Sequence, residues 1–389
     1  MSSGRAPHES PAADGDPGPA APGPAEPGPA DPGATDPHGR GPQRFLPQAL
    51  ALSWGLQFAF LTPTIGLLLV ALYGATAREV GWSLAAYNIS GFVSNLVIPT
   101  RADRTGDYTR PMVWCGALTL ALTCALAAAP TLPWAVLALV LLGGPAGVAM
   151  GLLFAHLRSA GVPTAEVMRT RAVFSFAFAV GPPLATFIVG LLGDRSVLVF
   201  IAGIALVGMG LSLVLTRLTR VGLEGRPSVE PEPLWSAVRR PGVWPLLSAF
   251  VLLQAANSAS VVVMTLFVTD RLGLDVIWGG IALGVAAALE IPALLLIGRL
   301  ATRFGSLRLL VAGGGAGVAY FLLVASATGP VVLVASQALN AAFVAAIAGA
   351  GLTVFQDVLP RPGLASALFT NTFRVGAIVA GPLIGLGQA

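Results

Sequence analysis

From Leu46 to the end of the chain, long apolar stretches alternate with short polar breaks. A helix needs roughly 20 apolar residues to cross the hydrocarbon core of a bilayer. Eleven stretches have about that length, at residues 48–73, 80–99, 111–130, 133–155, 168–192, 196–216, 244–268, 276–298, 307–327, 330–354 and 364–388. A transmembrane β-barrel shows segments of about ten residues with alternating polarity instead. The pattern predicts an all-α protein embedded in the lipid bilayer.

The first 45 residues follow a different pattern. They contain 11 of the 31 prolines, and residues 16–40 read as five related pentads rich in Pro, Gly and Ala. Such a tract buries too little surface to offset its chain entropy, so residues 1–45 are predicted to be a disordered tail that acts as a tether. The charged start and compact apolar core of a signal peptide are missing.

Composition narrows the class of protein. The chain is 55% hydrophobic and 10% charged, with a mean hydropathy of +0.79, whereas soluble domains carry charge at about a quarter of positions. All 22 basic residues are arginine, and a net charge of +4 spread along a membrane chain indicates no nucleic-acid partner. Two cysteines and three histidines form no metal-binding pattern, and no nucleophile–base pair is visible. We expect neither an enzyme nor a cofactor.

The arginines are distributed unevenly between the breaks. Fifteen lie in or beside the breaks that follow even-numbered stretches, and three lie in the others, at Arg78, Arg195 and Arg271. Because positive charge is retained on the cytoplasmic side, the N-terminus and the even-numbered loops are predicted to be cytoplasmic. The predicted location is the inner (plasma) membrane, crossed many times.

The two parts of the apolar region repeat each other at an offset of about 200 residues. The matching words are Asp103–Gly106 with Thr302–Gly305, Gly151–Leu153 with Gly351–Thr353, and Gly181-Pro182 with Gly381-Pro382. Each match falls at the corresponding loop or helix, which indicates two homologous units. We therefore predict a six-helix bundle at 46–216, a cytoplasmic linker at 217–243 and a second bundle at 244–389.

These words resemble a known family. The two-part plan and the Asp103-Arg104-x-Gly106 loop are similar to the major facilitator superfamily, whose signature after the second span is G-x-x-x-D-R-x-G-R-R. Here Pro99 replaces the first glycine, and Asp107-Tyr108 replace the basic pair, with Arg110 nearby.

Within that superfamily the chain resembles the bacterial sugar efflux transporters between about Thr62 and Gly385. The similar words are Arg171 with Gly181–Ala185, Leu289–Ala293, Phe355–Asp357 and Leu368–Asn371. The resemblance implies the major facilitator fold of two pseudo-symmetric helical bundles. It also implies twelve spans, whereas eleven are visible here as six and five, so the twelfth is expected to be missing from this sequence.

Ionisable residues deep in an apolar stretch are the first candidates for function, because burying charge in lipid is costly. Glu290 is the one acidic residue that lies deep in a stretch. Burial favours its neutral form, so Glu290 is our candidate for proton coupling, with the proton gradient as energy source. The alternative is a glutamate that only hydrogen-bonds a neighbouring helix.

Two arginines complete the set of candidate charges. Arg374 lies about 15 Å into the last stretch by helical rise. It could bind a sugar hydroxyl, bind an anionic group, or form a static ion pair with Glu290. Arg171 lies near the cytoplasmic end of its stretch, where it could extend toward water or line the mouth of a cavity. Both are candidate substrate-binding residues.

A neutral, hydroxyl-rich substrate favours amide side chains as binding groups. The amides within the apolar stretches are Gln57, Asn88, Asn95, Gln254, Asn257, Gln337, Asn340 and Asn371. The resemblance implies that stretches 1, 4, 7 and 10 line a central cavity. The pairs on stretches 7 and 10 are each spaced by three, so each shares one helix face, and this favours the cavity. For any single amide, a helix–helix hydrogen bond is the stronger alternative.

A third group of residues is predicted to control opening. Asp103 could accept hydrogen bonds from the positive N-terminal end of the eleventh helix when the cytoplasmic side is closed. The alternative is a solvated turn. The remaining gating candidates are Arg104 and Gly106 in the same loop, Arg303 in the equivalent loop, and Gly181, Pro182, Gly381 and Pro382. Those glycines and prolines are predicted to bend or thin helices where the two halves meet.

The combined prediction is a monomer that exports sugars or sugar-like molecules by alternating access in exchange for protons. The first alternative is a multidrug or antibiotic exporter of the same superfamily. The second is a transport-inactive membrane sensor or scaffold.

Overall fold

The computed structural model describes residues 45–220, 239–275 and 277–388. In that part of the chain every regular element is a helix, and no strand is present. Nine of these helices are long and apolar enough to cross a membrane, and the two parts of α1, bent by 47° relative to each other, would together make a tenth. The predicted class, an all-α membrane protein, is confirmed.

The exact number of spans stays a prediction. Helix α2 (Ala77–Thr105) has the length of a span, but polar residues such as Asn88 and Asn95 lower its hydropathy, and it is not among the nine. Residues 1–44, which hold nearly all of the predicted tail, and 221–238 of the predicted linker lie outside the described residues. Phe45–Ala389 forms one compact unit.

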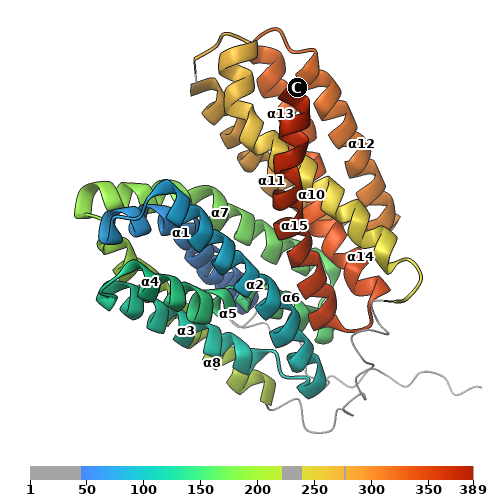
Figure 1. The fold of residues 1–389 in the computed structure, drawn as a ribbon. Coiled ribbons are helices and arrows are strands. Elements are labelled where there is room, and N and C mark those ends of the chain that lie inside the picture. Colours follow the sequence, from blue (N-terminus) through green and yellow to red (C-terminus); the bar gives the residue numbers. More distant parts are fainter. Residues whose placement is uncertain (1–44, 221–238, 276, 389) are drawn as a thin grey trace, which may run out of the picture. The chain divides into compact units, whose positions relative to one another are not determined.

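The first half of that unit contains the helices coloured blue to green in Figure 1. They are α1 (Leu46–Tyr73), α2, α3 (Thr109–Ala128), α4 (Leu132–Ala138), α5 (Gly144–Ala146), α6 (Ala149–Ser159), α7 (Thr164–Leu192) and α8 (Ser196–Arg220). A π-helical segment, η2 (Leu139–Gly143), joins α4 to α5, so the fourth predicted span is a helix with an irregular centre. Such π segments widen a helix locally and occur frequently at functional sites.

The second half contains the helices coloured yellow to red. They are α10 (Val243–Leu266), α11 (Ile277–Phe304), α12 (Ser306–Ala325), α13 (Pro330–Ala345), α14 (Gly351–Val358) and α15 (Pro362–Gln388). Two π segments interrupt or extend them, η3 (Phe267–Arg271) after α10 and η4 (Ala346–Ala350) between α13 and α14. The tenth predicted span therefore has an irregular centre like the fourth.

Local sequence determines where helix α2 begins and ends. Thr76 and Glu79 form a reciprocal capping box at its start, which satisfies two backbone N–H groups of the first turn. Gly106 ends the helix with φ +67°, a conformation that costs glycine little. Asp103 and Arg104, predicted to lie in a loop, instead form the last turn of α2.

Within each half, neighbouring helices approach closely at glycines. A Cβ atom on Gly116 of α3 would lie 2.7 Å from Met209 Cβ of α8, and one on Gly181 of α7 would lie 2.4 Å from Ala59 Cβ of α1. Gly317 of α12 meets the ring of Phe343 in the same way. Small residues at such crossings allow the dense packing that holds helices together in lipid.

The buried apolar side chains form three clusters. The largest contains residues of both halves, including Leu153, Met168, Leu294 and Phe355. A second consists of first-half residues only, and a third of second-half residues only. The shared cluster lies at the ends of α2, α6 and α14 and the starts of α7 and α15. We refer to this side of the bundle as the closed end.

Candidate functional site

Among the described residues, two ionisable side chains lie at the middle of long helices. Glu290 is about 20 Å from either end of α11, and Arg374 is about 18 Å from the start of α15. Arg171 lies about 10 Å into α7. These three residues are the charged groups around which a site within the membrane can be built.

Glu290 joins the two halves of the molecule. The hydroxyl of Ser175, on α7, donates a hydrogen bond of 2.7 Å to Glu290 Oε1. Arg171, one helical turn before Ser175, interacts electrostatically with the same carboxyl group. A protonatable group with one polar and one cationic neighbour on the opposite half can couple its charge state to the distance between the halves.

Aromatic rings hold the guanidinium of Arg171 in place. Its central carbon lies 4.8 Å from the ring centroid of Phe174 and 5.9 Å from that of Phe154. Its Nε atom is buried and has no hydrogen-bond partner. Arg171 is thus held beside Glu290 of the other half, and this place as the cationic neighbour of the carboxyl group was not predicted from the sequence.

Arg374 contacts the other interface between the halves. Its Nη1 atom donates to the backbone carbonyl of Asn88, at 3.2 Å, and to the side-chain Oδ1 of the same residue, at 3.1 Å. No ion pair between Arg374 and an acidic residue is present in the described part of the chain. Of the three roles considered for Arg374, the static pair with Glu290 is thus not formed.

The paired amides of α10 and α13 occupy different environments. Gln337 and Asn340 share a face as predicted, and Asn340 Nδ2 donates to Gln337 Oε1 at 3.1 Å. That face is inside the second half: Gln337 is fully buried and also donates to the carbonyl of Leu333. The pair is buried and Asn340 Oδ1 has no hydrogen-bond partner, so the expectation that this pair lines a cavity stays a prediction.

The other amides divide into buried and partly open positions. Gln254 is 1% exposed, and its Nε2 atom has no hydrogen-bond partner. Its side chain packs against Gly376 of α15. Gln57 is also buried, and its Oε1 atom has no hydrogen-bond partner. Asn257, one turn from Gln254, is only half-buried. Asn371 donates to the carbonyl of Phe92 on α2 at 3.2 Å and keeps Oδ1 unpaired. Buried amide atoms without partners are available to a hydroxyl or a water.

Asp103 makes a compact contact with the start of α15. Its Oδ1 accepts from the backbone N–H of Gly363 at 2.6 Å, and its Oδ2 accepts from that of Leu364 at 3.0 Å. The guanidinium of Arg361 lies 3.5 Å from Oδ2, and the Asp103 side chain is only 4% exposed. The contact that the sequence suggested is present, and its role as a latch stays a prediction.

Tyr108 completes the surroundings of Asp103. Its hydroxyl donates to Asp103 Oδ1 at 2.7 Å. Burial and the neighbouring carboxylate raise the pKa of Tyr108, so the hydroxyl keeps its proton and remains a donor. The Asp103 carboxylate therefore accepts hydrogen bonds from both halves of the molecule.

The remaining gating candidates have more ordinary surroundings. Arg104 is exposed, and Arg303 lies over the ring of its neighbour Phe304 at 5.3 Å. Gly181 packs against Ala59 of α1 in its own half, and its role in gating stays a prediction. Pro182 is accommodated within the continuous helix α7. The side-chain surroundings of Gly381 and Pro382, near the end of α15, lie outside the described residues.

The sequence analysis missed a second contact at the closed end. Arg158 Nη2 lies 2.5 Å from Asp357 Oδ1 and also reaches the carbonyl of Gln356. The amide of Gln356 donates in turn to the carbonyl of Phe154, at 3.3 Å. Arg158 and Asp357 each stand one residue before the end of their helix, α6 and α14. The sequence did hold a signal for this contact, because Arg158 and Asp357 are opposite charges at equivalent positions of the two repeats.

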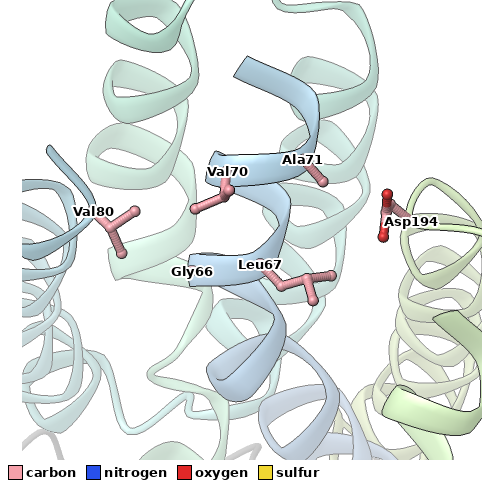
Figure 2. A pocket seen from close by; sticks show the side chains of 6 residues that line it. All are labelled: Gly66, Leu67, Val70, Ala71, Val80 and Asp194. Carbon is pink, nitrogen blue, oxygen red and sulfur yellow. The ribbon is translucent and has the colours of Figure 1, made fainter. Parts of the chain in front are cut away.

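A cavity in the described part of the chain lies away from these groups. Figure 2 shows Leu67 and Ala71 of α1, Val80 of α2 and Asp194 around it. Its volume is about 530 Å³, and its lining is almost entirely apolar. In the described residues no group of three or more His, Cys, Asp or Glu side chains could hold a metal ion. The polar interfaces around Glu290 and Arg374 are therefore the better candidate site.

Comparison with known proteins agrees with this architecture. The family model described as Major Facilitator Superfamily matches residues 49–382. Sugar efflux transporter A of Escherichia coli (strain K12) is 30% identical over 344 residues, 86% of each chain. Sugar efflux transporter C of the same organism is 32% identical over 340 residues, 85% of this chain and 86% of the relative.

Another relative and a solved structure agree as well. The putative sugar efflux transporter of Deinococcus radiodurans is 31% identical over 360 residues, 87% of this chain and 91% of the relative. A bacterial homologue of the iron transporter ferroportin, solved in an outward-facing state, superposes with a TM-score of 0.69 at 17% identity, over 88% of this chain and 91% of that one. That likeness shows the fold alone. The chain belongs to the major facilitator superfamily and, within it, to the family of the sugar efflux transporters.

Proposed function

We propose that the protein exports sugars or sugar-like small molecules across the inner membrane by alternating access, in exchange for protons carried by Glu290. The single observation that carries the coupling is the position of Glu290, which lies at mid-membrane on α11 and bonds to Ser175 on α7 of the other half. The relatives named sugar efflux transporters support the choice of substrate class.

Coupling follows from the groups that face Glu290. While α7 and α11 are in contact, Ser175 donates a hydrogen bond to the Glu290 carboxyl group and Arg171 places a positive charge beside it. When the halves separate at this interface, the carboxyl group loses both neighbours. The change of neighbours links proton exchange at Glu290 to the opening of the cytoplasmic side.

The distribution of contacts supports a conformation open away from the cytoplasm. The halves share one apolar cluster at the closed end, and each has its own cluster elsewhere. Asp103 and Arg158 both bridge the halves at the closed end. The uneven distribution of arginines places that end, and the N-terminus, in the cytoplasm. Export then requires these bridges to open so that substrate enters from inside.

A reconstituted system tests the proposal. Purified protein in proteoliposomes with an imposed pH gradient should accumulate radiolabelled glucose or lactose analogues against their concentration gradient. Glu290→Gln should lower gradient-driven accumulation at least tenfold, because it keeps the hydrogen bond but cannot exchange a proton. It should retain sugar counterflow, which needs no net proton movement.

A matched control separates coupling from general damage. Glu166→Gln changes the acid at the start of α7, which pairs with Arg169 outside the middle of the membrane, and it should leave accumulation unchanged. Accumulation by Glu290→Gln at the wild-type rate would contradict the assigned coupling. Efflux of dyes or antibiotics without movement of any sugar would replace the sugar proposal with the drug exporter.

A further inference from the structure

Arg374 is a cation at mid-membrane whose partners in the described part of the chain are neutral. Both of its hydrogen bonds run from Nη1 to Asn88, one to the backbone carbonyl and one to the amide oxygen. The guanidinium is half-buried, and its Nε and Nη2 atoms are not among the buried atoms that lack a partner. These two donors are therefore accessible and unused.

The charges in the middle of the membrane do not cancel. Glu290 has Arg171 as its cationic neighbour, at the contact between α7 and α11. Arg374 lies at the other contact between the halves, where α15 meets α2. Among the described residues these three are the acidic or basic side chains well inside the helices, and the sum of their formal charges is one positive charge. An uncompensated cation at this depth is costly, and a bound anion removes that cost.

The hydrogen bonds of Arg374 leave one edge of the guanidinium without a partner. A Cβ atom on Gly91 would lie 2.4 Å from Nη1 and 2.6 Å from Nη2, so the absence of a side chain there is what admits the Arg374 head group against α2. A Cβ on Gly147 would lie 4.0 Å from Nη2, so this atom also lies near the irregular part of the fourth predicted span. Asn88 fixes Nη1, and the Nε–Nη2 edge is one that binds a carboxylate or phosphate with two parallel hydrogen bonds.

We propose that the transported molecule carries a negative charge, as a carboxylate or a phosphate ester on a hydroxyl-bearing ring, and that this group binds the Nε–Nη2 edge of Arg374. The inference rests on the proposed function and narrows its substrate class from sugars and sugar-like molecules in general to those that carry an acidic group. The unpaired Oδ1 of Asn371, one turn before Arg374, is placed to accept a ring hydroxyl.

Binding of three probes with the same ring tests the inference. Glucose, glucuronate and glucose 6-phosphate are titrated into purified full-length protein in detergent, with isothermal calorimetry as the measurement. Wild type should bind at least one of the two anions at least tenfold more tightly than glucose. The two anionic probes distinguish a carboxylate from a phosphate ester.

Two substitutions assign that preference to Arg374. Arg374→Gln should lower anion affinity at least tenfold more than it lowers glucose affinity. Asn88→Asp keeps Arg374 and the size of its partner but places a carboxylate about 3 Å from Nη1, and it should also abolish the preference. Asn88→Asp keeps the test decisive if Arg374→Gln does not fold, which thermal unfolding and gel filtration report.

The outcomes separate the two proposals. Equal binding of glucose and both anions by wild type, or an anion preference that survives both substitutions, overturns the anionic-substrate inference and leaves sugar export standing. Absence of binding of all three probes, together with absence of sugar accumulation in the proteoliposomes, overturns both. If wild type prefers an anion and this preference is lost in Arg374→Gln and in Asn88→Asp, the result supports sugar export and the anionic substrate.

Discussion

The carboxylate of Asp103 accepts hydrogen bonds from both halves of the molecule at once. It accepts from two backbone N–H groups at the start of α15 and from Tyr108, and it is nearly buried. Hydrogen bonds to a charged group contribute about 1.5–3 kcal/mol each, and the N-terminal end of a helix adds a favourable interaction with negative charge. One carboxylate can therefore contribute a large part of the free-energy difference between the closed and open states.

Replacement of Asp103 by asparagine should open the closed end. Asparagine keeps one acceptor oxygen but loses the charge and the second acceptor, so we expect at least a tenfold rise in the open population. The measurement is the alkylation rate of a cysteine introduced at Ser366, which is buried at the closed end, in a background without Cys115 and Cys124. Asp107→Asn is the matched control, because Asp107 contacts Thr109 and Arg110 of its own half. Equal alkylation of both variants would rule out the latch.

Arg158 and Asp357 should contribute less than Asp103, although their atoms are closer. Their side chains are 40% and 53% exposed, and exposed ion pairs contribute about 0–1 kcal/mol because water and salt screen them. A double-mutant cycle with Arg158→Ala and Asp357→Ala, read out by alkylation at the same position, should give a coupling energy of at most about 1 kcal/mol. A coupling energy above about 2 kcal/mol would show that this pair is a second latch.

At the scale of helices, glycines determine how closely α2 and α15 approach. A Cβ atom on Gly363 would lie 2.3 Å from the backbone carbonyl oxygen of Pro99, and a backbone atom cannot rotate out of the way. Gly363→Ala should therefore push α15 off α2 and raise alkylation at Ser366 to about the level of Asp103→Asn. Gly315→Ala in α12, where nothing lies within 4 Å, should behave as wild type. A closed Gly363→Ala variant would contradict the tight crossing.

Gly181 should affect stability and leave gating unchanged. A Cβ there would lie 2.4 Å from Ala59 Cβ inside the first half, and overpacking of this kind costs about 1–3 kcal/mol. Gly181→Val should lower the midpoint of thermal unfolding in detergent by several degrees. Gly190→Val in the same helix, where nothing lies within 4 Å, should not. An unchanged midpoint with altered alkylation at Ser366 would support the predicted gating role.

The sequence predicts the depth of a residue in the membrane better than the direction in which it points. Glu290 and Arg374 lie at mid-helix because hydropathy and helical rise fix depth. Their neighbours Arg171 and Asn88 were not predicted as partners, because the rotation of a helix about its axis is set by tertiary packing. For the same reason Gln337 and Asn340 were correctly placed on one face, while that face proved to be buried. Asp103 was predictable because a helix start attracts any nearby carboxylate.

At the scale of the whole molecule, the three apolar clusters distinguish contacts within a half, which stay formed, from contacts between the halves, which must break when the closed end opens. The clusters that belong to one half each hold their helices together in every state, whereas the shared cluster must be exposed when the closed end opens. Apolar surface exposed to an aqueous cavity costs about 25 cal/mol per Å². Opening at this end therefore has to be offset by substrate binding or by the change in charge at Glu290, and this is the physical basis for coupling in our proposal.

The ion pair between Arg158 and Asp357 distinguishes contact between unlike halves from contact between like halves. The two residues occupy equivalent places at the ends of α6 and α14, so the pseudo-two-fold axis of the repeat passes between them. In a dimer of two identical first halves the same place would bring two arginines together, and in a dimer of second halves two aspartates. Each half thus repels its own copy at this point and attracts the other. The ion pair therefore favours association of unlike halves over association of like ones.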